Sequence, residues 1–481
     1  MSTSRLLAIL FGALILFSLV AVLWAPDRDP EGKIPLVWVS DNNPARTAQI
    51  AAFNDENPDL HLRLDYGNKG PQKVILQSAS GVGPDIFDFS SLDIGTYVES
   101  GILWDVTEAA EELGFSAEKS GWPASIQTYT YNGRQYGFPC NTGTNILIFN
   151  KNVFDHFGIP YPTEVMTWGT FIKLAQKLGD LARGNTQNSR PIYSCAGFDW
   201  KLFFASQRGE FFDEKGMLQI ANSAALKKAF EMHRDFIFKY KLMPTSVEAQ
   251  AMSGQGGHGA GYINQFATNR FATIATGYWA LIAFNRAHQK QTEYLTAEGI
   301  SIEDIKEPLD RPVQLNAIPL PHFADQPPSY LVTSRVAGIN ARSPNREESL
   351  RFLKYLSGST YSKLLNEESD WLPGNPEYAE LGIVPGPPAL NRENLQAITV
   401  KAMQYGYSPR QSPFLLESDL QRVLKAQISR LESDPSLPVD SLLQSADAEL
   451  QTLMRRNLEH NPELKALFIE RFGEATWKAL P

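Results

Sequence analysis

The stretch Ile34-Pro-Leu-Val-Trp-Val39, followed by Ser40-Asp-Asn-Asn-Pro44, decides the fold class. A short apolar run that ends in polar, turn-forming residues is typical of a buried strand with a loop at its carboxyl end. The next segment, Ala45–Asn54, is expected to be a helix that Asn57-Pro58 stops. The alternating run Leu60–Asp65 then predicts a second strand.

The same rhythm continues along the chain. Val74–Ala79 is expected to be helical, and Gly83-Pro84 breaks the chain before Asp85–Phe89, which predicts a third strand. Strands that alternate with helices indicate an α/β protein, with a mostly parallel sheet that carries helices on both faces. Ligands of such sheets bind beyond the carboxyl ends of the strands. The loops after Val39 and Phe89 are therefore candidate binding segments.

Composition argues against several functional classes. The 481 residues include 44 Lys and Arg against 53 Asp and Glu, a net charge of −9, and no run rich in Lys or Arg suggests nucleic acid as a partner. Two cysteines, Cys140 and Cys195, are too few for a disulfide framework or a four-cysteine zinc site. Whether they form one disulfide bridge or remain two buried thiols stays open. The seven His lack metal-ligand spacing, and the common hydrolase, metalloprotease and P-loop motifs do not occur. We expect a protein that is not an enzyme and needs no cofactor or metal.

The amino terminus predicts export. Leu6–Ala25 is a run of 20 residues without a charge, long enough to cross a hydrocarbon core of about 30 Å as a helix. Arg5 before it and acidic residues after it favour a cytoplasmic amino terminus with the remaining chain outside. Residues 1–26 are interpreted as an uncleaved signal anchor rather than a cleaved signal peptide, because the apolar core of a cleaved signal is usually about 7–15 residues. A cleaved signal peptide is the second alternative, and a buried core helix is the third. The protein is expected in the periplasm or at the cell surface, anchored to the inner membrane or secreted.

Several short motifs follow one another in a fixed order. They are Phe53-Asn-Asp-Glu-Asn-Pro58, Gly83-Pro-Asp-Ile-Phe87, Tyr97-Val-Glu-Ser-Gly-Ile-Leu103, Tyr131-Asn-Gly-Arg-Gln-Tyr-Gly-Phe-Pro139 with Ile148-Phe-Asn-Lys151, Thr167-Trp168, Ala275-Thr-Gly-Tyr-Trp279 and Val336-Ala-Gly-Ile-Asn340. Each is weak alone. Together, across residues 34–356, the chain resembles the extracellular solute-binding proteins of ABC sugar importers, the maltodextrin-type family.

The resemblance implies a two-lobed periplasmic-binding-protein fold of type II, in which each lobe is a mixed β-sheet flanked by helices and a ligand lies in the cleft. It assigns residues 33–140 and 323–370 to lobe I, residues 145–318 and 374–456 to lobe II, and residues 457–481 to a C-terminal tail. The implied function is that of the solute-binding component of an ABC importer, which takes up a mono- or oligosaccharide by hinge closure. The implied partners are the transmembrane subunits of a permease and, through the N-terminal helix, the membrane. An exported carbohydrate-active enzyme and a tethered ligand-binding sensor subunit stay open as alternatives.

A sugar site needs planar aromatic rings for the C–H faces of the ligand and polar side chains for its hydroxyls. The polar groups must be placed in advance, because a buried polar group without a partner costs about 1–3 kcal/mol. By family position, Ser40 to Asn42 form the first ligand loop, Asn141 and Thr142 lie at the crossing between the lobes, and Trp279 is the stacking aromatic. The ligand-binding residues expected from these arguments are Trp38, Ser40, Asp41, Asn42, Phe89, Ser90, Ser91, Asn141, Thr142, Trp200, Tyr278, Trp279, Trp371 and Arg410. Packing in the core is the alternative for Trp38, and packing against the lobe is the alternative for Trp371.

Overall fold

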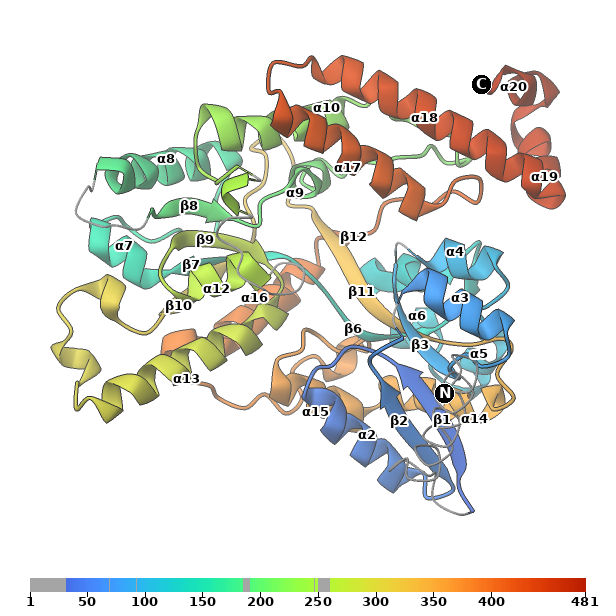
Figure 1. Cartoon of the computed structure of the whole chain (residues 1–481), viewed down its shortest axis with the longest axis horizontal. Coiled ribbons are helices and arrows are strands. Elements are labelled where there is room, and N and C mark those ends of the chain that lie inside the picture. Colours follow the sequence, from blue (N-terminus) through green and yellow to red (C-terminus); the bar gives the residue numbers. More distant parts are fainter. Residues whose placement is uncertain (1–31, 69, 92, 185–190, 246, 250–259) are drawn as a thin grey trace, which may run out of the picture.

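Two mixed β-sheets, each covered by helices, form two lobes (Figure 1). The computed structural model describes residues 32–68, 70–91, 93–184, 191–245, 247–249 and 260–481. The apolar segment Leu6–Ala25 lies outside these residues. Of the helices inside them, none combines the length and the apolarity needed to cross a bilayer. The α/β fold with two lobes agrees with the expectation from the sequence.

The sheet of lobe I has the strand order β12-β11-β3-β1-β2, and β6 pairs with β11. Strand β1 is parallel to β2 and β3, whereas β11 is antiparallel to both β3 and β6, so the sheet is mixed. The strands are β1 (Ile34–Val39), β2 (Leu60–Asp65), β3 (Ile86–Ser90), β6 (Phe138–Thr144), β11 (Tyr330–Ile339) and β12 (Gly406–Tyr407), with a separate hairpin of β4 (Thr130–Tyr131) and β5 (Arg134–Gln135). The covering helices are α2 (Ala45–Glu56), α3 (Pro71–Ala79), α4 (Ile94–Glu99), α5 (Thr107–Leu113), α6 (Ala117–Ser120), the 3₁₀ helix η1 (Pro123–Thr128), α14 (Arg346–Leu356) and α15 (Ser359–Glu368).

The sheet of lobe II has the strand order β10-β7-β9-β8. Its strands are β7 (Ile146–Asn150), β8 (Tyr193–Ala196), β9 (Phe271–Thr276) and β10 (Leu315–Ile318). Its helices are α7 (Lys151–Phe157), α8 (Trp168–Gly184), α9 (Trp200–Ala205), α10 (Ala224–Arg234) with the π-helical turn η2 (Asp235–Lys239), α12 (Ala260–Ala267), α13 (Leu281–Ala297), α16 (Arg392–Met403), α17 (Glu417–Ser433) and α18 (Val439–His460). Short 3₁₀ turns complete it: η3 (Tyr278–Ala280), η4 (Ile302–Asp304), η5 (Pro308–Asp310), η6 (Pro376–Tyr378) and η7 (Pro388–Leu390).

Two of the segments that cross between the lobes run along β6 into β7 and from β10 into β11 (Figure 1). Strands β6 and β11 pair in antiparallel register, with Thr144 opposite Val332 and Asn141 opposite Arg335. The two crossings therefore form one hydrogen-bonded ribbon. Because β1 and β3 run parallel, their carboxyl ends reach the same edge of the sheet.

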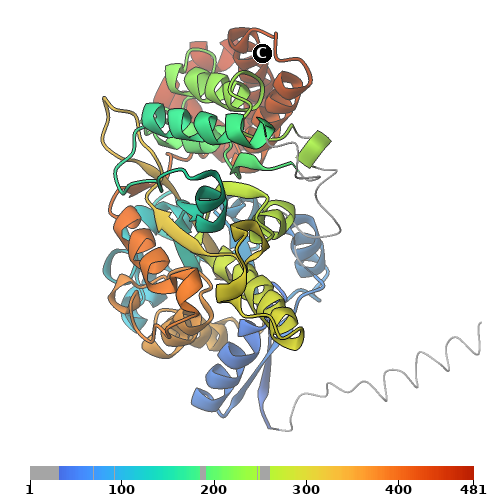
Figure 2. The same cartoon turned by 90° about the vertical axis from the view of Figure 1, so that its left-hand side faces the viewer.

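The C-terminal residues fold as part of lobe II. Helices α19 (Pro462–Phe472) and α20 (Glu474–Ala479) follow α18, and Phe468 and Trp477 belong to the large core cluster of lobe II. Residues 457–481 are thus packed helices where the sequence suggested only a tail. Figure 2 shows α17 to α20, in red, stacked at one end of the molecule.

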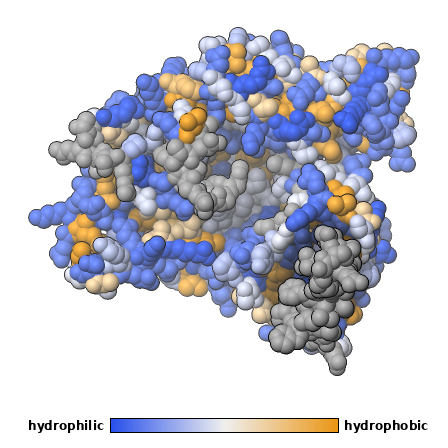
Figure 3. Space-filling model, viewed as in Figure 1, coloured by the Kyte–Doolittle hydropathy of each residue, from blue (hydrophilic) through white to orange (hydrophobic). Residues whose placement is uncertain are grey.

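The face seen in Figure 3 is mostly hydrophilic, with apolar side chains in small separate patches.

Truncating Phe468 tests whether α19 contributes to the fold. Its side chain is fully buried, and its ring lies edge-on to Phe414 at 5.2 Å between centroids. We expect Phe468→Ala to lower the free energy of unfolding by about 3–5 kcal/mol in chemical denaturation. The control Leu381→Ala, at a side chain that is 39% exposed, should change it by less than about 0.5 kcal/mol. Equal effects of the two substitutions would show that α19 is not part of the folded core.

Candidate ligand-binding site

A cavity of about 190 Å³ lies between the lobes beside the β6–β11 ribbon. Lobe I contributes Ser91, at the carboxyl end of β3, and Gln127 and Thr128 at the end of η1. The crossing segments contribute Asn145 and residues 331–333, and the remaining lining residues are Asp199, Lys201, Leu202, Phe204, Ala205, Phe211, Ser408, Pro409, Gln411, Glu417 and Gln421. The cavity is thus built from both lobes and from the strands that join them.

The lining of the cavity combines an apolar face with polar groups. Phe204 and Phe211 stack on each other, with ring centroids 4.5 Å apart and planes inclined by 21°. Asp199 precedes α9, and its Oδ1 accepts hydrogen bonds from the backbone N–H groups of Lys201 at 3.0 Å and Leu202 at 3.3 Å. This capping fixes the first turn of α9 and so places the Lys201 ammonium at the cavity.

Glu417 and Gln421 lie one turn apart on α17. Gln421 donates from Nε2 to Glu417 Oε1 at 2.8 Å, which leaves Gln421 Oε1 buried with no hydrogen-bond partner among the described residues. Burial raises the pKa of the Glu417 carboxyl, while the hydrogen bond from Gln421 and the charge of Lys201 act in the opposite direction. The pair therefore presents acceptors for ligand hydroxyls.

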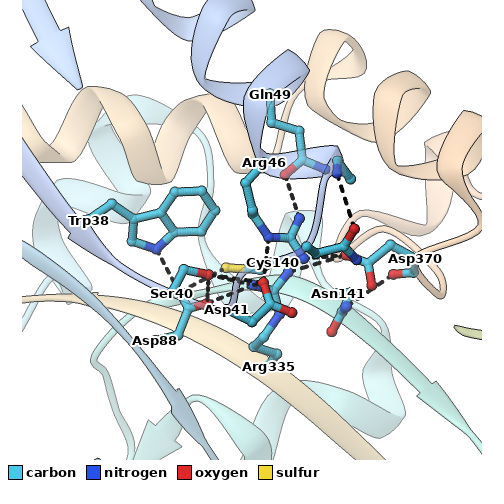
Figure 4. Close-up of polar contacts among 12 residues, drawn as sticks. Trp38, Ser40, Asp41, Arg46, Gln49, Asp88, Cys140, Asn141, Arg335 and Asp370 are labelled. Atoms are coloured by element: carbon cyan, nitrogen blue, oxygen red, sulfur yellow. Dashed lines mark hydrogen bonds and ion pairs between the residues drawn. The ribbon is translucent and has the colours of Figure 1, made fainter. Parts of the chain in front are cut away.

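A buried ion cluster centred on Arg335 lies in lobe I at the ribbon (Figure 4). Arg335 Nη1 lies 2.6 Å from Asp88 Oδ2 and donates to Ser40 Oγ at 2.8 Å. Its Nη2 lies 3.4 Å from Asp370 Oδ2. Burial acts to lower the pKa of Arg335, but the carboxylates of Asp88 and Asp41 outweigh it, so that this pKa is raised well above its usual value. The guanidinium stays charged and engaged within the protein.

A second arginine completes the cluster. Arg46, on α2, is fully buried; its Nε lies 2.8 Å from Asp41 Oδ1, and its Nη2 pairs with Asp370. Asp370 therefore pairs with both arginines. Asp41, the partner of Arg46, also lies near Arg335, with 3.5 Å between Asp41 Oδ1 and Arg335 Nη1. The cluster joins the end of β1 to α2, β3, β11 and the segment before Trp371.

The predicted polar site residues divide between this cluster, the cavity and the surface. Ser40 and Asp41 belong to the cluster, and Ser91 lines the cavity. Two residues of β6 are buried: Asn141 donates from Nδ2 to the carbonyl of Asp370 at 3.0 Å, and the Thr142 hydroxyl lies 2.8 Å from that of Ser334. The exposed ones are Asn42, Ser90, whose hydroxyl donates to Asp93, and Arg410, whose backbone N–H donates to Glu210.

Four of the predicted aromatic side chains are buried in the core. Trp38 is fully buried against Phe352, and its Nε1 donates to Asp88 at 2.7 Å. The others are Phe89 beside Tyr97, Trp200 beside Phe230 and Tyr278, whose hydroxyl donates to Ser369 at 3.2 Å. Trp38 and Trp200 are therefore buried, and contact of either with a ligand stays a prediction.

Trp279 and Trp371 meet beside Gly277. A Cβ at this glycine would lie 2.5 Å from Trp279 Cδ1 and 3.0 Å from Trp371 Cε2. Trp279 is half-buried, while Trp371 is only 8% exposed and its Nε1 has no partner among the described residues. Neither indole lines the 190 Å³ cavity, so contact of either with a ligand stays a prediction.

Sequence reasoning missed most of the polar lining, including Gln127, Asn145, Asp199, Lys201, Glu417 and Gln421. Two signals were available, since Asp199 and Glu417 stand at the starts of helices in lobe II. The sequence left open whether Cys140 and Cys195 form a disulfide bridge. In the structure both are free, buried thiols.

Two lobes that share a cavity at their crossing strands define a class of protein that binds small solutes. The chain belongs to the family of bacterial extracellular solute-binding proteins, whose model matches residues 48–391.

Three similar proteins have a known ligand or specificity. The arabinooligosaccharide-binding protein of Bacillus subtilis (strain 168) is 23% identical over 224 residues, which are 43% of this chain and 49% of that protein. The matched part thus spans about half the length of that relative. Among solved structures, Lmo0181 of Listeria monocytogenes with cycloalternan has a TM-score of 0.67 at 20% identity, covering 88% of this chain and 98% of that one. A Thermotoga lettingae solute-binding protein with α-D-tagatose has a TM-score of 0.67 at 17% identity, covering 88% and 100%. At these identities the two structures show a shared fold.

Removing Arg335 tests the ion cluster. We expect Arg335→Ala to lower the free energy of unfolding by about 3–5 kcal/mol, because it leaves Asp88 and Asp370 buried with fewer counter-charges. The control Lys227→Ala breaks an exposed ion pair with Asp440 and should cost no more than about 1 kcal/mol. Urea unfolding followed by circular dichroism measures both. A loss for Arg335→Ala as small as that of the control would contradict a structural role for the cluster.

Glu417 makes stability depend on pH. Since burial raises its pKa in the folded protein, the folded state binds this proton more tightly than the unfolded chain does, and stability falls as pH rises above the ordinary value of 4.5. Glu417→Gln removes the charge. We expect its Tm to exceed that of the unmodified protein at pH 8, and the difference to shrink toward pH 4, in thermal scans. A difference that is the same at both pH values would contradict a raised pKa.

Proposed function

We propose that this protein is the extracytoplasmic solute-binding component of an ABC importer and that it binds a carbohydrate between its lobes by hinge closure. The observation that carries the proposal is the 190 Å³ cavity, which both lobes and the β6–β11 ribbon line together. A ligand in such a site contacts both lobes only when they are closed. Its differential affinity for the two states therefore shifts the population toward the closed one.

The chemistry of the cavity supports a carbohydrate. The stacked rings of Phe204 and Phe211 offer an apolar face to the C–H groups of a sugar. Gln421 Oε1 and the Glu417 carboxyl accept hydrogen bonds, and Lys201 donates them, as the hydroxyls on the rim of a sugar require. Contacts of Trp279 and Trp371 with the ligand belong to the proposal as well.

The relatives support the carbohydrate and the transport role. The Bacillus subtilis relative, of which about half the length is matched, is an arabinooligosaccharide-binding protein. The two structures of the same fold hold cycloalternan and α-D-tagatose. We therefore place the protein outside the cytoplasm, with permease transmembrane subunits as its partners. Tethering to the membrane through Leu6–Ala25 is the preferred form of this proposal, and secretion is the other.

Binding without catalysis is the proposed mode of action, because the family consists of solute-binding proteins. The carboxylates at the cavity have structural partners: Asp199 caps α9, and Glu417 accepts from Gln421. Incubation with glycans followed by chromatography tests the alternative, and release of shortened products would favour an exported carbohydrate-active enzyme.

Calorimetric titration of the purified full chain with mono- and oligosaccharides tests the proposal. We expect at least one sugar to bind, and we expect Gln421→Ala to weaken this binding about tenfold, which corresponds to about 1.4 kcal/mol and to the loss of one hydrogen bond. The matched control is Gln72→Ala, at an exposed side chain on α3, which should leave the dissociation constant unchanged. If no sugar binds and another class of solute does, the carbohydrate part of the proposal is wrong.

A further inference from the structure

A second contact joins the two lobes, apart from the β6–β11 ribbon. Helix α4 of lobe I lies against the start of α17 in lobe II. A Cβ at Gly95 would lie 3.5 Å from Leu416 Cδ2, so the glycine lets the backbone of α4 come close to this side chain. The hydroxyls of Thr96 and Ser418 lie 3.4 Å apart. None of these residues lies on β6 or β11, so the contact adds to the connection that the ribbon provides.

The C-terminal helices extend this contact. Asn461, the residue before α19, donates from Nδ2 to Glu99 Oε2 on α4 at 3.2 Å. Its Oδ1 accepts from the backbone N–H of Leu464 at 3.3 Å and so caps α19. Because the cap holds the amide oxygen toward α19, the amide nitrogen is turned toward lobe I. Figure 1 shows α4 and α19 on the same side of the ribbon, one on each lobe.

Helix α19 also supports the lobe II side of the contact. Phe468 and Phe472 pack on Phe414, with ring centroids 5.2 and 5.8 Å from that of Phe414. Asn457, on α18, donates from Nδ2 to the carbonyl of Phe414 at 3.1 Å. Phe414 is fully buried and stands two residues before Leu416. The C-terminal helices therefore hold in place the segment that α4 meets.

The interlobe contact adjoins the cavity. A narrow gap between α4 and residues 411–417 shares Ser91, Gln411 and Glu417 with the lining of the cavity. Glu417 stands directly before Ser418, which meets α4. The first turn of α17 is therefore both a wall of the cavity and a part of the interlobe contact. A rotation that separates α4 from this turn moves Ser91 away from Glu417, and so opens the cavity on this side.

We infer that this interlobe contact is a latch that holds the lobes closed over the ligand. The latch consists of Gly95, Thr96 and Glu99 of lobe I and Leu416, Ser418 and Asn461 of lobe II. The inference rests on the proposed function, in which the lobes close on a ligand, and adds to it a group outside the cavity that sets the closing equilibrium. Because the ligand contacts both lobes only in the closed state, its apparent affinity scales with the population of that state. Loss of the latch therefore weakens the binding of different ligands by the same factor.

Replacing the amide of Asn461 by a carboxylate tests the latch. Asn461→Asp keeps a cap of equal quality on α19, but it puts a second carboxylate against Glu99. We expect the radius of gyration of the ligand-free full chain to rise in small-angle scattering, because the two charges repel. In calorimetric titrations with D-tagatose, maltose and maltotriose, we expect the dissociation constant of each sugar that binds to rise by one common factor of about three to ten, as for the loss of one hydrogen bond.

A reciprocal variant separates the latch from a local effect on α19. When Asn461→Asp is combined with Glu99→Gln, donor and acceptor change places, so the two side chains form a hydrogen bond again. We expect this double variant to recover the radius of gyration and to bring the dissociation constants within about twofold of those of the unmodified protein. The matched control is Asn222→Asp, which adds the same charge at an exposed side chain in the turn before α10 and should change neither quantity.

Two outcomes would contradict the latch. If the double variant does not recover, Asn461→Asp acts on α19 and not through Glu99. If Asn461→Asp shows a normal thermal transition with an unchanged radius of gyration and unchanged dissociation constants, the contact does not hold the lobes, and the proposed function still stands. If none of the sugars binds, the carbohydrate part of the proposed function is left without support, and the radii of gyration of the single and double variants decide the latch by themselves.

Discussion

The buried Arg46 and the half-buried Arg335, shared among three aspartates, hold the strand ends of lobe I in place. Arg335 contacts Asp88 and Asp370, and Arg46 contacts Asp41 and Asp370. A buried charge is tolerated only when it is paired and hydrogen-bonded. The positions of β1, β3, α2 and β11 are therefore coupled, because a shift of any one of them leaves a charge without its partner.

The same cluster fixes the chain segment that follows Asp370. Because Asp370 is anchored to both arginines, the next residue, Trp371, is turned onto Gly143 of the crossing ribbon. The cavity lies where α9, α17 and η1 meet, and their side chains provide many of its polar groups.

Short-range sequence patterns explain which features of the fold and the site could be predicted. The order of apolar strands and helices predicted the α/β class, and the ordered motifs predicted a two-lobed solute-binding fold. Ser91, which lines the cavity, was predicted because it follows a strand in a sheet of the kind that binds ligands at its strand ends. Trp38 was left open because alternation shows that a side chain changes faces without showing which face is covered. Phe352, on a helix more than 300 residues further along the chain, covers it.

The sequence by itself determined the fold class, the family and the strand-end loops, since these depend on short-range periodicity and on motifs within a few residues. The tertiary structure alone decided which polar groups are engaged within the protein and which face the cavity. Asp41, Asp88 and Asp370 are indistinguishable from surface acids until folding brings Arg46 and Arg335 to them. Glu417 and Gln421 line the cavity only because α17 packs beside the crossing strands, and no local pattern encodes that packing.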